Sequence, residues 1–89
     1  MEEATVTREL PKYKSHKTVY ALKIKNVNSD GNPGMILEPE DHENYAPFRV
    51  DQAFLDRNRP VPGGYYVVYE DGYKSFSPAK AFEEGYTRL

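Results

Sequence analysis

The side chains best suited to bind a ligand gather in one short basic segment near the N-terminus. Tyr13, Lys14, His16 and Lys17 lie within five positions of one another, together with a serine. Ammonium and hydroxyl groups donate hydrogen bonds to phosphate or carboxylate oxygens. Residues 10–29 contain five lysines and no acid, whereas the remainder C-terminal to them has eleven acids and six bases. An anionic ligand would therefore bind near the first third of the chain, unless this segment is simply solvated.

Tyrosine is the second conspicuous residue type, with eight copies beside four phenylalanines and no tryptophan. A nucleobase stacked on an aromatic ring gains about 1–3 kcal/mol. Tyr13, Tyr20 and the tyrosines within residues 65–76 could supply such rings, or the rings could pack in a core, because tyrosine has a large apolar body. We predict a ligand-binding set of Tyr13, Lys14, His16, Lys17, Arg49, Tyr69 and Lys74.

Motifs for catalysis are missing from the sequence. The chain has no cysteine, no G-x-S-x-G nucleophile elbow and no phosphate-binding glycine loop. The pair Gly63-Gly64 precedes a strand pattern and does not join a strand to a helix. The two histidines are far apart in the sequence, and the acidic run around His42 is typical of a solvated loop. We predict a non-enzymatic protein without a metal site or cofactor.

Length and composition favour one small domain. The chain has 89 residues, and separate cores usually need well over 100 residues each. Without cysteine no disulfide can stabilise the fold, so packing against a second copy is expected. No apolar run approaches the roughly 18 residues of a spanning helix, which predicts a cytoplasmic protein. We expect a flexible tail over residues 1–11 and one domain over residues 12–89.

A β-hairpin is predicted for the first half of the chain. Residues 18–27 alternate apolar and polar side chains, as a half-buried strand does. The inward face of this strand would carry Tyr20, Leu22 and Ile24. Residues 28–34 are dense in turn formers, and the apolar run over residues 35–37 should return antiparallel. The acidic residues 38–46 should form an exposed loop.

A short helix should follow this hairpin. Residues 47–50 are predicted to be extended, and Asp51 is a suitable N-cap for a helix over residues 52–58. Phe54 and Leu55 would then face inward. The prolines and glycines that follow prevent the helix from continuing.

The strongest β signal is the run of β-branched and aromatic residues at 65–69, which a turn should reverse into residues 73–76. Two registers are open. A two-residue Asp-Gly turn places Tyr69 opposite Lys74, whereas a three-residue loop with Gly72 at a bulge places Tyr69 opposite Tyr73. Because a slip of one residue moves every side chain to the other face, the register decides which tyrosines are buried.

A second short helix should close the chain, with Ser77 as its N-cap, Pro78 as its first residue and its end near Glu84. Its buried side would consist of Ala79, Ala81 and Phe82. The whole pattern predicts an α+β domain, a small antiparallel sheet or barrel-like roll of four to five strands with two short helices. We expect most of the stabilising apolar surface in the hairpin over residues 65–76 and in this helix.

Several short sequences form a recognisable set: KYKSHK (12–17), ALKI (21–24), GGYYVVYEDGYKS (63–75), SP (77–78) and FEEGY (82–86). Over about residues 12–89 the chain thereby resembles a family of small proteins of tailed bacteriophages and prophages. Similar modules follow a helical hairpin, which is absent here, in longer phage proteins of the kind associated with sponges for cyclic or ADP-ribose-derived immune signals. The resemblance implies a phage protein in the host cytoplasm and carries no catalytic residue with it.

Two functions from different classes follow as expectations. In the first, the protein sequesters a small anionic, nucleotide-like signal of host immunity. Lysines would contact its phosphate and tyrosines would stack on its base. In the second, it is an interaction module that inhibits or redirects a host protein through its acidic loop and exposed tyrosines, because aromatic residues dominate interface hot spots. Binding of single-stranded nucleic acid is disfavoured by the net charge of -2.

Overall fold

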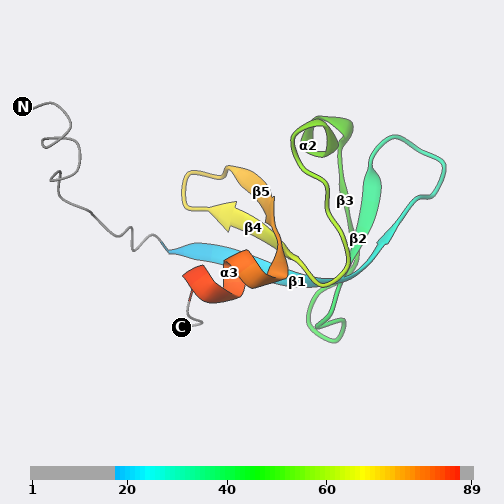
Figure 1. The fold of residues 1–89 in the computed structure, drawn as a ribbon. Helices are drawn as coiled ribbons and strands as arrows, with labels where there is room; N and C mark the ends of the chain where they lie inside the picture. The colour runs from blue at the N-terminus through cyan, green and yellow to red at the C-terminus, as the bar shows by residue number, and fades with distance from the viewer. Residues whose placement is uncertain (1–17, 87–89) are drawn as a thin grey trace, which may run out of the picture.

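The computed structural model describes residues 18–86, so the tail predicted over residues 1–11 lies outside the described part. These residues form five strands and two helices (Figure 1). The elements are β1 (Val19–Asn28), β2 (Met35–Pro39), β3 (Phe48–Val50), α2 (Gln52–Arg57), β4 (Tyr65–Tyr69), β5 (Lys74–Ser77) and α3 (Ala79–Gly85). The predicted α+β class with five strands and two short helices is confirmed.

All five strands belong to one antiparallel sheet in the order β3-β2-β1-β4-β5. The central strand β1 pairs with β4 through residues 19–23 and with β2 through residues 24–28. A register shift between Ile24 and Asn26 separates these two halves. Because a bulge bends a strand and increases its twist, the sheet curls into a half-barrel, with α2 near one half and α3 near the other (Figure 1).

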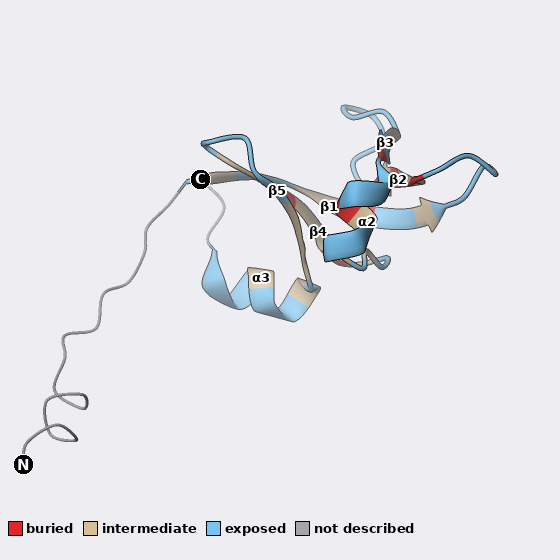
Figure 2. Ribbon diagram, turned by 90° about the horizontal axis from the view of Figure 1, so that it is seen from above, coloured by how far each residue is buried: buried red, intermediate tan, exposed pale blue. Residues whose placement is uncertain are grey.

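The hydrophobic core lies inside this curl. Four of the five buried hydrophobic residues, each at most 5% exposed, form one cluster: Ile24, Leu37, Val50 and Phe54. The fifth, Val67 of β4, is 2% exposed and lies outside this cluster. Figure 2 shows most buried residues where β1, β2, β3 and α2 meet. The predicted concentration of apolar surface in the second hairpin is therefore wrong, because that hairpin adds only half-buried Tyr66 and Phe76 to this cluster.

Helix α2 begins and ends through side-chain hydrogen bonds. The Asp51 carboxylate accepts a hydrogen bond from the Phe54 N–H at 2.9 Å, which confirms the predicted N-cap. At the other end the Asn58 side chain donates to the Phe54 carbonyl and accepts from the Phe76 N–H at 3.1 Å. Asn58 therefore links the helix to the outer edge of β5, which no further strand covers.

The second hairpin adopts the three-residue loop of the two predicted registers. The Tyr69 N–H donates to the Tyr73 carbonyl, the Gly72 N–H donates to the Tyr69 carbonyl, and Gly72 has a φ of 91°. Val68 then pairs with Lys74, so Tyr69 and Tyr73 share one face of the sheet. By alternation Tyr65 lies on that face, whereas Tyr66 points into the core and contacts Phe48 with ring centroids 4.7 Å apart.

Three local predictions need correction. Ser77 is the last residue of β5 and does not cap α3, whose N-cap is Pro78 without a side-chain hydrogen bond. In the stretch predicted as an exposed loop, Pro39 is a fully buried residue of β2. Tyr20 lies on the inward face but is 67% exposed, because the core ends before the sheet does.

Gly64 brings the start of β4 close to β5. A Cβ at this position would stand 2.9 Å from the Ser77 carbonyl oxygen and would overlap the Phe76 ring. We expect Gly64→Ala to lower the free energy of unfolding by about 1–3 kcal/mol, the usual cost of overpacking, in a denaturant titration. Gly85→Ala, whose Cβ would meet open space, serves as the control and should not lower it. Equal stability of both variants would contradict the close packing at Gly64.

Candidate functional site

The predicted ligand-binding residues do not form one site in the described part of the chain. Tyr13, Lys14, His16 and Lys17 lie outside the described residues. The other three stand on three different strands: Arg49 on β3, Tyr69 on β4 and Lys74 on β5.

Arg49 is engaged with the turn between β1 and β2. Its guanidinium donates to the Pro33 carbonyl at 2.9 Å and forms an ion pair with Asp30. This hydrogen bond from Arg49 lowers the pKa of the Asp30 carboxyl below its ordinary value, with a further contribution from the backbone of Asn32. Arg49 therefore stabilises a turn, and its strand β3 is separated from β4 in the sheet by β2 and β1.

Tyr69 and Lys74 lie on opposite faces of the β4–β5 hairpin. Lys74 pairs with Val68, and Val68 also pairs with Tyr20 of β1, so these three residues form one row on the inward face. Tyr69 is the neighbour of Val68 in β4 and hence points to the other face. A single small ligand cannot contact both side chains in this arrangement.

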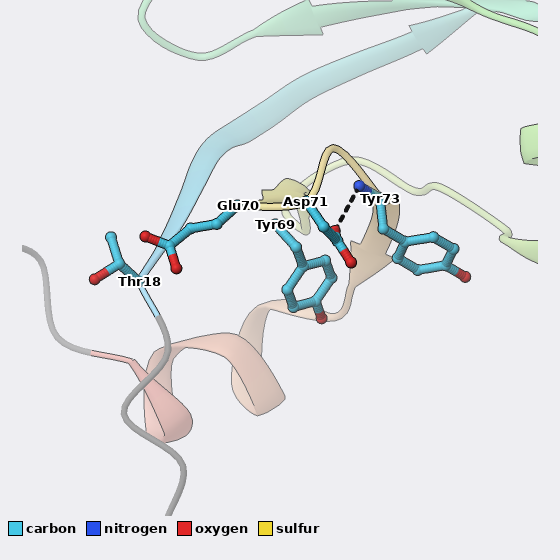
Figure 3. A pocket seen from close by; sticks show the side chains of 5 residues that line it. All are labelled: Thr18, Tyr69, Glu70, Asp71 and Tyr73. Carbon is cyan, nitrogen blue, oxygen red and sulfur yellow. Dashed lines mark hydrogen bonds between the residues drawn. The ribbon is translucent and has the colours of Figure 1, made fainter.

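A hollow of about 400 Å³ lies at the tip of this hairpin, beside the start of β1. We call it the hairpin hollow, and it is lined by Thr18, Tyr69, Glu70, Asp71 and Tyr73. In Figure 3 the Glu70 side chain points toward Thr18, and the Asp71 carboxylate is seen between the two tyrosine rings. The ring centroids of Tyr69 and Tyr73 are 5.9 Å apart. The hollow thus combines two carboxylates, three hydroxyl groups and two aromatic rings.

Turn geometry fixes Asp71 of the hairpin hollow. Asp71 Oδ1 accepts a hydrogen bond from the Tyr73 N–H at 2.9 Å, which leaves its second oxygen for other donors. Within residues 18–86 neither Glu70 nor Asp71 has an ion-pair partner. Burial, with a smaller contribution from Tyr86, raises the pKa of Tyr69, so that its hydroxyl stays neutral. The hairpin hollow therefore carries negative charge and is suited to a cationic group.

Cations already lie over aromatic rings in this part of the fold. The Arg57 guanidinium of α2 stands 5.8 Å from the centroid of the Tyr73 ring, and Lys23 Nζ stands 5.6 Å from that of Tyr65. Both distances are within the range of cation–π attraction. Tyr73 remains 50% exposed, so a further cation can reach its ring.

Helix α3 is attached to the Tyr69 face of the sheet through aromatic stacking. Phe82 stacks on Tyr65 at 4.2 Å between ring centroids, and Tyr86 stacks on Phe82 at 4.6 Å. No residue of α3 is fully buried, and its predicted inner residue Ala81 is exposed. This helix of seven residues therefore depends on a few side-chain contacts with β1 and β4.

Glu83 is the polar part of this attachment. Its Oε2 accepts hydrogen bonds from the Tyr65 hydroxyl at 2.8 Å and from Lys23 Nζ at 3.3 Å. The hydrogen bond from Tyr65 and then that from Lys23 lower the pKa of the Glu83 carboxyl. The same hydrogen bonds to Glu83 raise the pKa of Lys23 and of the Tyr65 hydroxyl.

Sequence reasoning treated Glu70 and Asp71 only as turn residues and so missed the acids of the hairpin hollow. The available signal was the segment Tyr69-Glu70-Asp71-Gly72-Tyr73, in which a tight turn places two tyrosines on either side of two acids. That signal depends on the register, because only the three-residue loop brings both rings to one face.

Comparison with protein-family models, with curated proteins and with solved structures gave no match for this chain. The predicted membership in a phage family therefore stays a prediction. Within residues 18–86 no group of three or more possible metal ligands comes together. In the same range no helix is long and apolar enough to span a membrane.

The attachment of α3 to the sheet should weaken at acidic pH. Because the folded-state pKa of Glu83 is lowered, its stabilising contribution is present above the ordinary value of 4.5 and is lost as the pH falls through the lowered pKa. We expect the protection of α3 amides against hydrogen exchange, taken relative to the intrinsic exchange rate at each pH, to fall below about pH 4.5 in the wild-type protein. In Glu83→Gln this acid dependence should be weaker, because the side chain no longer titrates.

Glu84→Gln is the matched control, since Glu84 lies next to Glu83 and is exposed. It should keep the wild-type pH dependence of exchange in α3. An identical pH profile in Glu83→Gln and the wild type would show that Glu83 does not hold the helix.

Proposed function

We propose that this chain is a non-catalytic binding domain that recognises a lysine- or arginine-bearing segment of a protein partner through its hairpin hollow. The observation that carries this proposal is the Asp71 carboxylate between two tyrosine rings, with Glu70 beside it on the same turn (Figure 3). A lysine ammonium or arginine guanidinium can donate to the carboxylates while lying against a ring.

The charge of the surrounding domain supports a cationic partner. Residues 18–86 contain seven lysines and arginines and eleven aspartates and glutamates. Three of these cations are engaged: Arg49 with Asp30, Lys23 with Glu83, and Arg57 over the Tyr73 ring. An acidic domain attracts basic segments over a Debye length of about 10 Å, and this attraction weakens with salt.

The exposed aromatic residues add contact surface around the hairpin hollow. Tyr73 and Tyr86 are 50% and 37% exposed, and Tyr86 continues the stack of Phe82 on Tyr65. Tyrosine supplies a large contact area with few rotatable bonds, which is why it is frequent at the centres of protein interfaces. A partner segment would thus place a cation at the acids and apolar side chains against these rings.

Titration with short basic peptides tests this function. Tetra-arginine and tetralysine are the probes, tetraglutamate is the negative probe, and amide chemical shifts report the site. The titration uses the full chain and also a K12Q/K14Q/K17Q form, which lacks the three lysines of the basic segment. We expect E70Q/D71N to weaken peptide binding at least about tenfold, about 1.4 kcal/mol. Both amides keep an acceptor oxygen, so the turn is preserved.

The matched control is E40Q/D41N, because it removes two adjacent acids from the exposed 40–46 loop and causes the same change in net charge. It should weaken binding less than E70Q/D71N does. Equal effects of the two double variants would show that only net charge attracts the peptide. Failure of both protein forms to bind any basic probe more tightly than about 1 mM, about -4.1 kcal/mol, would contradict the function.

A second candidate function is sequestration of a small anionic, nucleotide-like signal, in keeping with the predicted phage resemblance. One observation favours it: Tyr20, the most exposed of the large apolar side chains at 67%, lies in the same row as Lys74 on the inward face, with Val68 between them. A base can stack on such a ring while an ammonium contacts the phosphate. Tyr20 follows Lys17, the end of the basic segment, by three positions.

Calorimetric titration with cyclic dinucleotides, cyclic mononucleotides and ADP-ribose tests this second function. We expect one of them to bind more tightly than about 100 μM, about -5.5 kcal/mol, and Y20A/K74Q to weaken that binding at least about tenfold. The matched control Y45A/K80Q removes an exposed tyrosine and a lysine outside the row and should bind normally. No binding, or equal loss in both variants, would contradict it.

A further inference from the structure

One half of strand β1 has an open side, although the strand lies in the middle of the sheet. On one side β4 pairs with residues 19–23, whereas on the other side β2 pairs only with residues 24–28 (Figure 1). The Glu40 N–H donates to the Lys23 carbonyl at 2.8 Å and closes the β2 side at that residue. Within the described residues no strand continues beyond this point. We call residues 18–22, on this side, the β1 free edge.

Backbone alternation shows which groups of the β1 free edge are unpaired. The Lys23 carbonyl faces the β2 side, where it accepts from Glu40, and the backbone groups of Ile24 bond on the β4 side. The N–H and carbonyl of successive residues in an antiparallel strand point to opposite sides. Val19 and Ala21 therefore direct their backbone N–H and carbonyl groups to the open side, where nothing in residues 18–86 pairs with them.

The outer edges of the sheet are protected, whereas the β1 free edge is not. Exposed edges are normally blunted by charges, prolines, bulges or covering side chains, because an open edge pairs with other chains. On β5 the Asn58 side chain accepts from the Phe76 N–H at 3.1 Å, and β3 is only three residues long and carries Arg49. Residues 18–22 read Thr-Val-Tyr-Ala-Leu, with no charge, no proline and a regular register. This difference indicates that the β1 free edge is a pairing surface.

We propose that two copies of this chain pair antiparallel along their β1 free edges, about a two-fold axis at Tyr20. Val19 of each copy then lies opposite Ala21 of the other, and each such pair exchanges both of its backbone hydrogen bonds. A centre at Val19 or at Ala21 would instead place the other of these two residues opposite a residue outside the free edge. Only the centre at Tyr20 satisfies every open group of both copies. This inference rests on neither proposed function.

The side chains fit the same register. Tyr20 is 67% exposed, the highest value among the large apolar side chains. In the paired copies it stands opposite its own counterpart in a pair without hydrogen bonds, with Cα atoms about 4.5 Å apart, where cross-strand side chains are closest. The row of Tyr20, Val68 and Lys74 then meets its copy at the tyrosines. The lysines stand at the two far ends of this joined row, so like charges do not face each other.

Sedimentation equilibrium of the full chain tests the pairing. An interface of five residues from each copy is small, so we expect a transient dimer with a Kd of about 100 μM. Tyr20→Lys should raise this Kd at least about tenfold, because it places two ammonium groups directly opposite each other. Tyr45→Lys is the matched control, since it makes the same change at a tyrosine that is 49% exposed and lies outside the β1 free edge. It should change the Kd less than about twofold.

Ala21→Pro tests the backbone contribution separately. The Ala21 N–H has no partner in the described part of a single chain, and proline is tolerated on an edge whose N–H faces solvent. We expect this variant to keep the wild-type chemical shifts of Ile24 and Phe54 in the core but to raise the dimer Kd at least about tenfold. A folded Ala21→Pro variant with the wild-type Kd would overturn the proposal.

Amide hydrogen exchange locates the interface. The protection of Val19 and Ala21 should rise with protein concentration, because a second copy covers them. Tyr20 and Leu22 are internal controls, since their N–H groups face β4 and should have the same protection at every concentration.

Three outcomes would contradict the pairing. A chain that stays monomeric up to about 500 μM has no such dimer. Equal effects of Tyr20→Lys and Tyr45→Lys would show that the added charge acts without regard to position. Protection of Val19 and Ala21 that does not depend on concentration would assign the β1 free edge to a segment of the same chain.

Discussion

The bend of β1 at Ile24 is the constraint on which the rest of the fold depends. On one side of Ile24 the strand pairs with β4, and on the other side it pairs with β2. The backbone groups of Ile24 bond to Gly63 and Gly64, and the Ile24 side chain is 1% exposed at the centre of the core. Because one strand serves both halves of the sheet, bending it creates a concave space that α2 fills with Phe54. Without the bend the sheet would have no enclosed core in a chain of this size.

The same bend explains why so many tyrosines are left for binding. The core occupies the half of the sheet near β2, β3 and α2, so the far end of the β4–β5 hairpin extends beyond it. Of the tyrosines in residues 18–86, only Tyr66 packs against the core, and the others lie half-buried or exposed on the surface. Whether a tyrosine of β4 packs in the core or lies on the outer face depends on its position along the strand. Because side chains alternate, Tyr66 points inward and Tyr65 and Tyr69 point outward.

Helix starts and turns could be predicted from residues that are close in sequence. The pairing of strands and the ion-pair partners of charged side chains could not. Asp51 predicts its helix correctly because an N-cap side chain bonds to a backbone N–H only three residues away. The turn at Gly72 is likewise determined by residues that are close in sequence. The core position was misjudged because β-propensity is strongest at residues 65–69, but burial depends on which strands curl around α2. Arg49 was assigned to a ligand because its pairing with Asp30, nineteen positions earlier, exists only after β2 and β3 align.

The buried cluster and the hairpin hollow lie at different ends of one small sheet. Ile24, Leu37 and Phe54 hold the fold together at one end, while Glu70 and Asp71 stand on a turn that contributes nothing to that cluster. Asp71 supports its turn by accepting from the Tyr73 N–H, and within residues 18–86 neither it nor Glu70 has an ion-pair partner. The near-neutral total charge of the chain thus conceals a basic stretch over residues 10–29 and an acidic remainder C-terminal to it.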